Sequence, residues 1–189
     1  HIGLGMSGDL LLIAPASANT IAKLASGIAD NLLCVTALAA RCPIMIAPAM
    51  DGGMFGHPAT QVNLETLRQR GVIIVGPAEG RMASGLVGLG RMVEPLDILG
   101  QARLALSRGG RLAGKRIVIT AGGTQEPIDP VRIITNRSSG RQGYALAQAA
   151  LDAGAQVTLI HAPTGLSLPT GAEEKSVITA ADMHQAVLE

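Results

Sequence analysis

Short apolar runs alternate with longer amphipathic stretches along the chain. Residues 9–16 (DLLLIAPA), 43–50 (PIMIAPAM) and 72–77 (VIIVGP) are apolar at nearly every position, whereas residues 17–40 and 95–106 have helical spacing. Strands that are apolar on both faces are typical of a parallel sheet covered by helices. The pattern therefore predicts an α/β fold that binds its ligands at the carboxyl ends of the strands.

A basic, glycine-containing segment interrupts this alternation at residues 107–114, and a new strand-like run, RIVITAGG, follows it. We therefore expect two Rossmann-like, parallel-sheet domains, at residues 1–106 and 115–189, joined by a linker at 107–114. The chain begins with His1 rather than Met, and its last residues have the pattern of a helix cut in mid-course. We expect both domains to be incomplete and the chain to be a fragment of a longer protein.

Composition narrows the classes of partner. The net charge is +1, 15% of residues are charged, and the chain has one Tyr, one Phe and no Trp. A nucleic-acid-binding protein usually has a basic field or aromatic stacking platforms, so we expect no nucleic acid. The longest apolar runs are far shorter than the roughly 20 residues of a membrane span. Cys34 and Cys42 lie in or beside apolar runs, which favours buried thiols in a reducing cytoplasm.

The stretch RIITNRSSGRQG, residues 132–143, places polar and small residues between a strand and a helix. Small residues and the free N–H groups at the start of a helix suit a phosphate group. Ser138 or Ser139 could instead cap the helix, and the spacing alone does not separate these two interpretations.

The longer string ITAGGTQEPIDPVRIITNRSSGRQGYALA, residues 119–147, resembles the phosphopantothenate–cysteine ligase family. The resemblance implies activation of the carboxylate of 4′-phosphopantothenate by CTP with Mg²⁺, and its ligation to cysteine. It also implies that Arg132 and Asn136 contact the acyl-cytidylate intermediate. An ion pair of Arg132 with Asp129 or Glu126 is the alternative. The residues that the resemblance places around phosphate groups are Gly122, Gly123, Ser138, Ser139 and Gly140.

Three strings in the first half, APASANTIAKLASGIADNLL, PAMDGGMFGHPATQVNL and ASGLVGLGRMVEP, resemble the flavin-dependent cysteine decarboxylases, specifically the phosphopantothenoylcysteine decarboxylases. The order of the two halves is that of the bifunctional coenzyme A biosynthesis family, with a flavoprotein-type domain before a ligase-type domain. The resemblance implies that FMN oxidises the thiol-bearing carbon of 4′-phosphopantothenoylcysteine, that carbon dioxide leaves, and that the reduced flavin returns the hydride to give 4′-phosphopantetheine.

The same resemblance assigns roles in the first half. His1 aligns with the catalytic histidine, as a base or as a partner of the substrate carboxylate. The residues implied to hold FMN are Ser17, Ala18, Asn19, Thr20 and Met50. The residues implied to contact the substrate are Pro48, Asp51 and Met54.

Two positions depart from the family pattern. Asp51 stands where an asparagine usually contacts the substrate carboxylate; an ionised Asp51 would repel that group unless burial raises its pKa or the local geometry differs. Ser84 stands where many members have a cysteine that donates a proton, and a hydroxyl is a far weaker acid than a thiol. The final reductive step is therefore expected to be impaired. Gly85, Gly88 and Gly90 suggest a mobile flap or a static turn.

The predicted function is coenzyme A biosynthesis in the cytoplasm, with 4′-phosphopantothenate, cysteine, CTP and 4′-phosphopantothenoylcysteine as ligands. The resemblance implies a trimeric decarboxylase core and a dimeric ligase half, hence a homo-oligomer. Two alternatives remain: a non-catalytic flavoprotein subunit of the same fold, and a peptidyl-cysteine decarboxylase that releases an enethiol. We expect the short chain itself to be weakly active at best.

Overall fold

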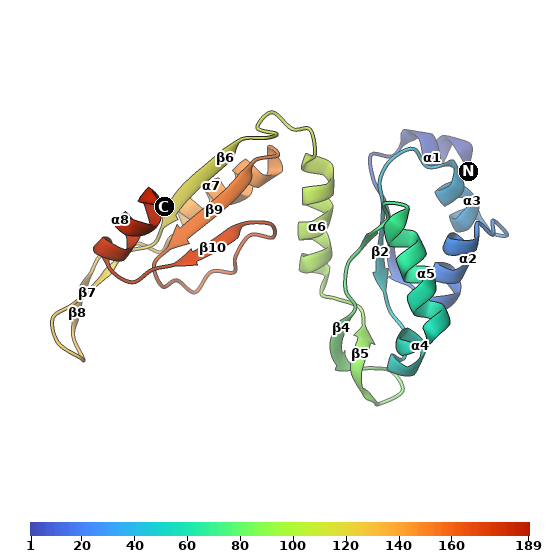
Figure 1. Cartoon of the computed structure of the whole chain (residues 1–189), viewed down its shortest axis with the longest axis horizontal. Coiled ribbons are helices and arrows are strands. Elements are labelled where there is room, and N and C mark those ends of the chain that lie inside the picture. The colour runs from blue at the N-terminus through green and yellow to red at the C-terminus, as the bar shows by residue number, and fades with distance from the viewer. The chain divides into compact units, whose positions relative to one another are not determined.

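The computed structural model describes residues 1–189, which divide into two compact units, His1–Ala105 and Leu106–Glu189 (Figure 1). Each unit contains a three-stranded parallel sheet with helices packed on it. The predicted α/β class with parallel sheets is confirmed. Residues 107–114 lie in the second unit, where the Leu112 amide donates to the Ala153 carbonyl at 2.8 Å.

The first unit is built around the sheet β1-β2-β3. Its elements, in chain order, are α1 (Ile2–Ser7), β1 (Leu11–Ala16), α2 (Ala18–Ser26), α3 (Leu32–Ala39), β2 (Ile44–Pro48), α4 (Gly52–Gly56), α5 (Pro58–Gln69), β3 (Ile73–Ile74), β4 (Ala78–Arg81), β5 (Val87–Arg91) and α6 (Pro95–Ser107). The last two residues of α6 fall in the second unit.

Apolar side chains fill both faces of this sheet. On one face, Ile21 of α2 and Leu64 of α5 are buried with Ile46 of β2. On the other face, Met45 of β2 is buried with Ile98 of α6. Successive strand residues point to opposite faces, so the continuous apolar run of β2 feeds both clusters.

The helical pattern at residues 17–40 corresponds to two helices rather than one. The first, α2, ends at Gly27, whose φ of 72° is left-handed and whose amide donates to the Lys23 carbonyl. The second, α3, is capped by Asn31, whose side chain accepts a hydrogen bond from the Cys34 amide. Glycine adopts the left-handed conformation at little cost, and it stops the helix although the apolar spacing continues.

The glycine-rich segment after β3 forms an antiparallel hairpin, β4–β5, instead of the loop that the composition suggested. Its register pairs Arg81 with Val87 and Gly80 with Gly88, and it shifts between Ala78 and Glu79. We call this element the glycine-rich hairpin.

The second unit has the sheet order β10-β9-β6. Its elements are β6 (Arg116–Ala121), β7 (Gln125–Pro127), β8 (Ile133–Thr135), α7 (Arg141–Asp152), β9 (Gln156–His161), β10 (Glu173–Ser176) and α8 (Ala180–Leu188). A Cβ atom on Gly143 would lie 2.6 Å from the Cβ of Ala121, so only glycine lets α7 approach β6 this closely. The longest helix, α6, has 13 residues, and no helix has both the length and the apolar character of a membrane span.

Candidate functional site

The carboxyl edge of the first sheet brings together two of the predicted ligand-binding segments. Ala16, the last residue of β1, pairs with Pro48, the last residue of β2. The Ala49 amide donates to the Ala16 carbonyl at 3.0 Å, which fixes the two strand ends side by side. The corner that follows β1, at Ser17, therefore lies at the same edge as Met50, which follows β2.

Ser17 caps α2. Its Oγ accepts a hydrogen bond from the Thr20 amide at 3.3 Å and lies 3.1 Å from the Thr20 Oγ1. Ser17 and Asn19 are exposed, and Ala18 is partly buried. Two hydroxyl groups, an exposed amide side chain and the first-turn N–H groups form a donor set that fits a phosphate or the polar edge of a flavin.

A cavity of about 570 Å³ lies between α4 and the glycine-rich hairpin. Its lining includes Asp51, Phe55 and Gln61 from the α4–α5 side, and Met82 and Leu89 from the hairpin. We call it the hairpin cavity.

Three other residues that were predicted to contact the flavin or the substrate, Pro48, Met50 and Met54, have different environments. Pro48 is fully buried, Met50 is half-buried against the core, and Met54 is 52% exposed. None of the three lines the hairpin cavity.

Asp51 and Ser84, the two departures from the family pattern, are hydrogen-bonded to each other. The Ser84 Oγ donates to the Asp51 Oδ2 at 2.7 Å, and the Gly53 amide donates to the Asp51 Oδ1 at 3.0 Å. The Ser84 hydrogen bond, followed by that of Gly53, holds the pKa of the Asp51 carboxyl below its usual range. The suggestion that burial raises this pKa is therefore wrong, because both carboxylate oxygens have donors that favour the ionised form.

The base of the glycine-rich hairpin is fixed against the segment that follows β2. The Met50 amide donates to the Gly90 carbonyl at 2.9 Å. A Cβ atom on Gly90 would lie 2.3 Å from the Met50 carbonyl oxygen, so no other residue fits there. Hydrogen bonds from Met50 and Ser84 thus hold the hairpin at its base and near its tip.

His1 is exposed and lies at the start of α1, where its carbonyl accepts the Gly5 amide at 2.9 Å. Its side chain makes no capping hydrogen bond, and it does not line the hairpin cavity. Its catalytic role stays a prediction.

A second cavity, of about 490 Å³, lies where β6 ends and α7 begins. Its lining includes four of the residues that the sequence predicted around phosphate groups: Gly122, Ser138, Ser139 and Gly140. Arg137 and Arg141 also line it. Sequence reasoning assigned no role to Arg137, although its place inside the motif NRSSG was a usable signal.

The start of α7 does not have the serine cap that was one alternative. Its N-cap is Gly140, with a left-handed φ of 74° and no capping side chain. The Ser138 Oγ instead accepts from the Gly140 amide at 3.4 Å. The first-turn N–H groups of α7 therefore have no side-chain acceptor within the chain.

Asn136 and Gly123 do not line this second cavity, but Asn136 is hydrogen-bonded to Ser138, which does. The Asn136 Oδ1 accepts from the Ser138 amide at 2.8 Å, and a Cβ atom on Gly123 would lie 2.3 Å from the same oxygen. Glycine at position 123 is thus required for Asn136 to adopt this position.

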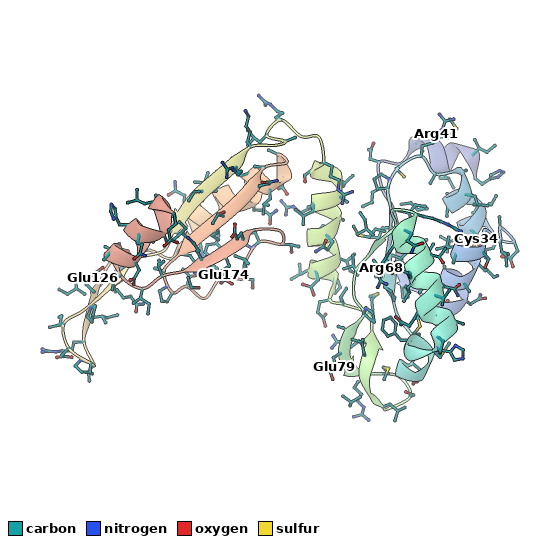
Figure 2. The ribbon with its side chains drawn as sticks, in the orientation of Figure 1. Cys34, Arg41, Arg68, Glu79, Glu126 and Glu174 are labelled. Atoms are coloured by element: carbon teal, nitrogen blue, oxygen red, sulfur yellow. The ribbon has the colours of Figure 1, made fainter.

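Arg132 forms the ion pair that was the alternative to its catalytic role. Its Nε donates to the Asp129 Oδ2 at 2.6 Å, and its side chain is 71% exposed. The Val131 amide, the Arg132 amide and this guanidinium lower the pKa of Asp129. Glu126, which is part of β7, accepts from the Ala180 amide instead (Figure 2). Arg132 does not line the second cavity.

Two family models match the chain. A flavoprotein model matches residues 1–103, and a model of the DNA/pantothenate metabolism flavoprotein C-terminal domain matches residues 112–189. Each match falls largely within one of the two units.

Full-length relatives are about twice as long as the chain. The coenzyme A biosynthesis bifunctional protein CoaBC of Bacillus subtilis is 50% identical over an aligned stretch of 191 residues, which covers 100% of this chain and 47% of that protein. A cysteine/cysteine sulfinic acid decarboxylase from an unknown prokaryotic organism is 50% identical over an aligned stretch of 196 residues, which covers 100% of this chain and 54% of that protein. The chain thus spans about half the length of these relatives.

Solved structures resemble the first unit. A PPC decarboxylase with a cysteine-to-serine substitution, complexed with pantothenoylaminoethenethiol, is 42% identical with a TM-score of 0.54, over 55% of this chain and 58% of that one. The FMN binding protein AtHal3 is 40% identical with a TM-score of 0.50, over 55% of this chain and 57% of that one.

Proposed function

The chain belongs to the flavoprotein family, and from this premise we propose that its first unit is an FMN-dependent decarboxylase of a cysteine-derived carboxylate, with 4′-phosphopantothenoylcysteine as the substrate. The observation that carries the proposal is the arrangement at the carboxyl edge of the first sheet. The Ser17 corner lies at that edge, and the hairpin cavity adjoins the segment that follows β2. The complex of a similar PPC decarboxylase with pantothenoylaminoethenethiol supports this choice of substrate.

Ser17, Asn19 and Thr20 would hold FMN through their hydroxyl, amide and backbone N–H groups. When bound, FMN supplies a reversible two-electron oxidation of the carbon that bears the thiol. The chain itself orients the substrate in the hairpin cavity, and the hairpin limits the access of water to it.

A matched pair of capping variants tests the FMN site. Ser17→Ala and Asn31→Ala each remove one helix cap, of α2 and α3 respectively. Each should cost about 1 kcal/mol of stability. Only Ser17→Ala should also weaken FMN binding, as measured by titration of flavin absorbance. Equal FMN affinities in the two variants would contradict the placement of the flavin.

Decarboxylation is tested by incubating the FMN-loaded chain with 4′-phosphopantothenoylcysteine and following the product by mass spectrometry. A product that has lost carbon dioxide alone indicates complete turnover. A product two hydrogens lighter indicates that the reaction stops before reduction. Absence of any decarboxylated product would overturn the proposal and leave the non-catalytic flavoprotein subunit.

One observation favours a second candidate, a peptidyl-cysteine decarboxylase that releases an enethiol. The Ser84 hydroxyl donates a hydrogen bond to Asp51, so its O–H group is not directed at a product. A hydroxyl is also a far weaker acid than the thiol that many relatives are implied to use at this position. The lighter product, formed from a peptide with a carboxy-terminal cysteine, would select this candidate.

For the second unit we propose a role in the CTP-dependent ligation of 4′-phosphopantothenate to cysteine, with Mg²⁺ accompanying the nucleotide. The cavity lined by Ser138, Ser139 and two arginines supports a phosphorylated ligand. Calorimetric titration should therefore show binding of 4′-phosphopantothenate or CTP with Mg²⁺, and Arg137→Gln should weaken it. Arg108→Gln is the control, because Arg108 does not line this cavity. Equal binding in the two variants would contradict the assignment.

Two further proposals concern the whole protein. We place it in the cytoplasm. The proposed role in coenzyme A biosynthesis suits this compartment, and free thiols such as Cys34 and Cys42 stay reduced there. We also propose a homo-oligomer, trimeric through the decarboxylase part and dimeric through the ligase part. Light scattering of the FMN-loaded chain measures its mass, and a monomer at all concentrations would contradict this proposal.

A further inference from the structure

The hydrogen-bonding partners of Asp51 define which substrate group can approach it. Its Oδ2 accepts from Ser84 and its Oδ1 from Gly53, yet each carboxylate oxygen can accept more than one hydrogen bond. Asp51 is only partly buried and it lines the hairpin cavity. The carboxylate therefore offers a negative charge and spare acceptor capacity to a molecule in that cavity.

The cysteine moiety of a cysteine-derived substrate carries three polar groups: a carboxylate, a thiol and the nitrogen on its α-carbon. The carboxylate is repelled by an ionised Asp51. The nitrogen is a hydrogen-bond donor whether it is a free ammonium or an acylated amide. The thiol is only a weak hydrogen-bond donor, and once ionised it is repelled as well. Of the three groups, the α-nitrogen is therefore the one whose hydrogen bonding and charge complement Asp51.

We propose that Asp51 accepts a hydrogen bond from the α-nitrogen of the substrate and that Ser84 is a positioning residue that fixes this carboxylate. The proposal rests on the proposed function, because it concerns a cysteine-derived substrate in the hairpin cavity. It adds a specificity: an acylated cysteine binds through its amide N–H, and a cysteine with a free ammonium gains a charge attraction as well.

Three probes with a methylated sulfur separate binding from chemistry, because the thiol that the decarboxylation requires is blocked. They are 3-(methylthio)propanoate, which lacks the nitrogen, N-acetyl-S-methylcysteine, which has an amide N–H, and S-methylcysteine, which has an ammonium. Calorimetry on the FMN-loaded chain should show binding that tightens in this order. We expect the ammonium probe to bind about tenfold more tightly than the amide probe, as for a partly screened charge pair.

Asp51→Asn isolates the charge. Asparagine is as good an N-cap as aspartate, so α4 should keep its start, and its side-chain oxygen can still accept from an N–H. This variant should keep the preference for the amide probe over the probe without nitrogen, and lose the tenfold gain for the ammonium. Glu79→Gln is the matched control, since it makes the same change on β4, where Glu79 is exposed and outside the cavity lining (Figure 2). It should bind all three probes as the unaltered chain does.

Ser84→Ala tests the positioning role. Without the hydroxyl the Asp51 carboxylate loses one of its two fixed donors, so the preference for nitrogen-containing probes should fall several-fold. Ser84→Thr, which keeps a hydroxyl at the same position, should restore it. A merely structural serine would change the affinities for all three probes alike.

The outcomes separate this inference from the function beneath it. An unchanged ammonium preference in Asp51→Asn, equal binding of the three probes, or binding of none overturns the role of Asp51. If the probe preferences hold but no carbon dioxide leaves 4′-phosphopantothenoylcysteine, the nitrogen-recognition site stands and the decarboxylase proposal fails. If 4′-phosphopantothenoylcysteine is decarboxylated but the probes show no preference, the decarboxylase proposal stands and the role of Asp51 fails.

Discussion

Replacing Gly90 by alanine tests how the glycine-rich hairpin is attached to the rest of its unit. The new Cβ atom would lie 2.3 Å from the Met50 carbonyl oxygen and 3.0 Å from the Met82 sulfur. The first of these is a backbone atom, so the strand must move by roughly 1 Å to reach an ordinary contact. Overpacking of this kind costs about 1–3 kcal/mol. Loss of the 2.9 Å hydrogen bond from Met50 to Gly90 adds about 0.5–1.5 kcal/mol.

Gly88→Ala is the matched control, because its Cβ atom would meet only the Met82 methyl group, at 3.9 Å. It should be neutral or slightly stabilising, since alanine loses less backbone entropy than glycine in a strand. Urea unfolding followed by circular dichroism should therefore separate the two variants by about 2–4 kcal/mol. Hydrogen exchange at the Met50 amide should accelerate only in Gly90→Ala. Equal unfolding midpoints and an equally protected Met50 amide would refute this account of the hairpin.

Three other predictions follow from single contacts. Gly143→Ala should destabilise the second unit by about 1–3 kcal/mol, because its Cβ atom would lie 2.6 Å from that of Ala121. Fluorescence of the single tyrosine during unfolding measures this, and Gly165→Ala, with no atom within 4 Å, should unfold as the unaltered chain does. Ser84→Cys should raise the share of fully reduced decarboxylation product in mass spectrometry, and an unchanged share would exclude a proton-donor role at this position. The lowered pKa of Asp51 keeps its carboxylate ionised from about pH 5 to pH 7, so the preference for the ammonium probe should be constant there. It should be lost only at a pH below the ordinary pKa of an aspartate carboxyl, about 3.9, because the pKa of Asp51 is lowered; a midpoint above that ordinary value would contradict the assignment.

The sheets of both units could be predicted from the sequence because their signal is local. The apolar runs at residues 11–16 and 44–48 are strands of a parallel pair, as their composition indicated. The division of residues 17–40 was missed because apolar spacing continues across Gly27, and only the backbone conformation shows that the first helix stops there. The β4–β5 hairpin was also missed, since glycine-rich strands lack the β-branched residues that usually mark a strand.

The sequence indicated which segments form the candidate sites, but not which side chains contact each other within them. The motif around Ser138 and Gly140 lines a cavity, and its role in binding phosphate groups stays a prediction. The hydrogen bond between Asp51 and Ser84 joins residues 33 positions apart, and no local pattern reports such a contact. For the same reason the direction of the Asp51 pKa shift could not be read from the sequence. It depends on donors that the hairpin brings to the carboxylate.

The glycine at the start of α7 has a consequence for the stability of the second unit. No side chain caps the first turn of α7, so its free N–H groups can be satisfied by a bound anion. Binding of that anion then stabilises the folded state, which links ligand affinity to the free energy of unfolding. Under the proposed function, a phosphorylated ligand at a hundred times its dissociation constant would add about 2.7 kcal/mol to the stability of this unit. The melting temperature of the second unit would then report the concentration of its own ligand.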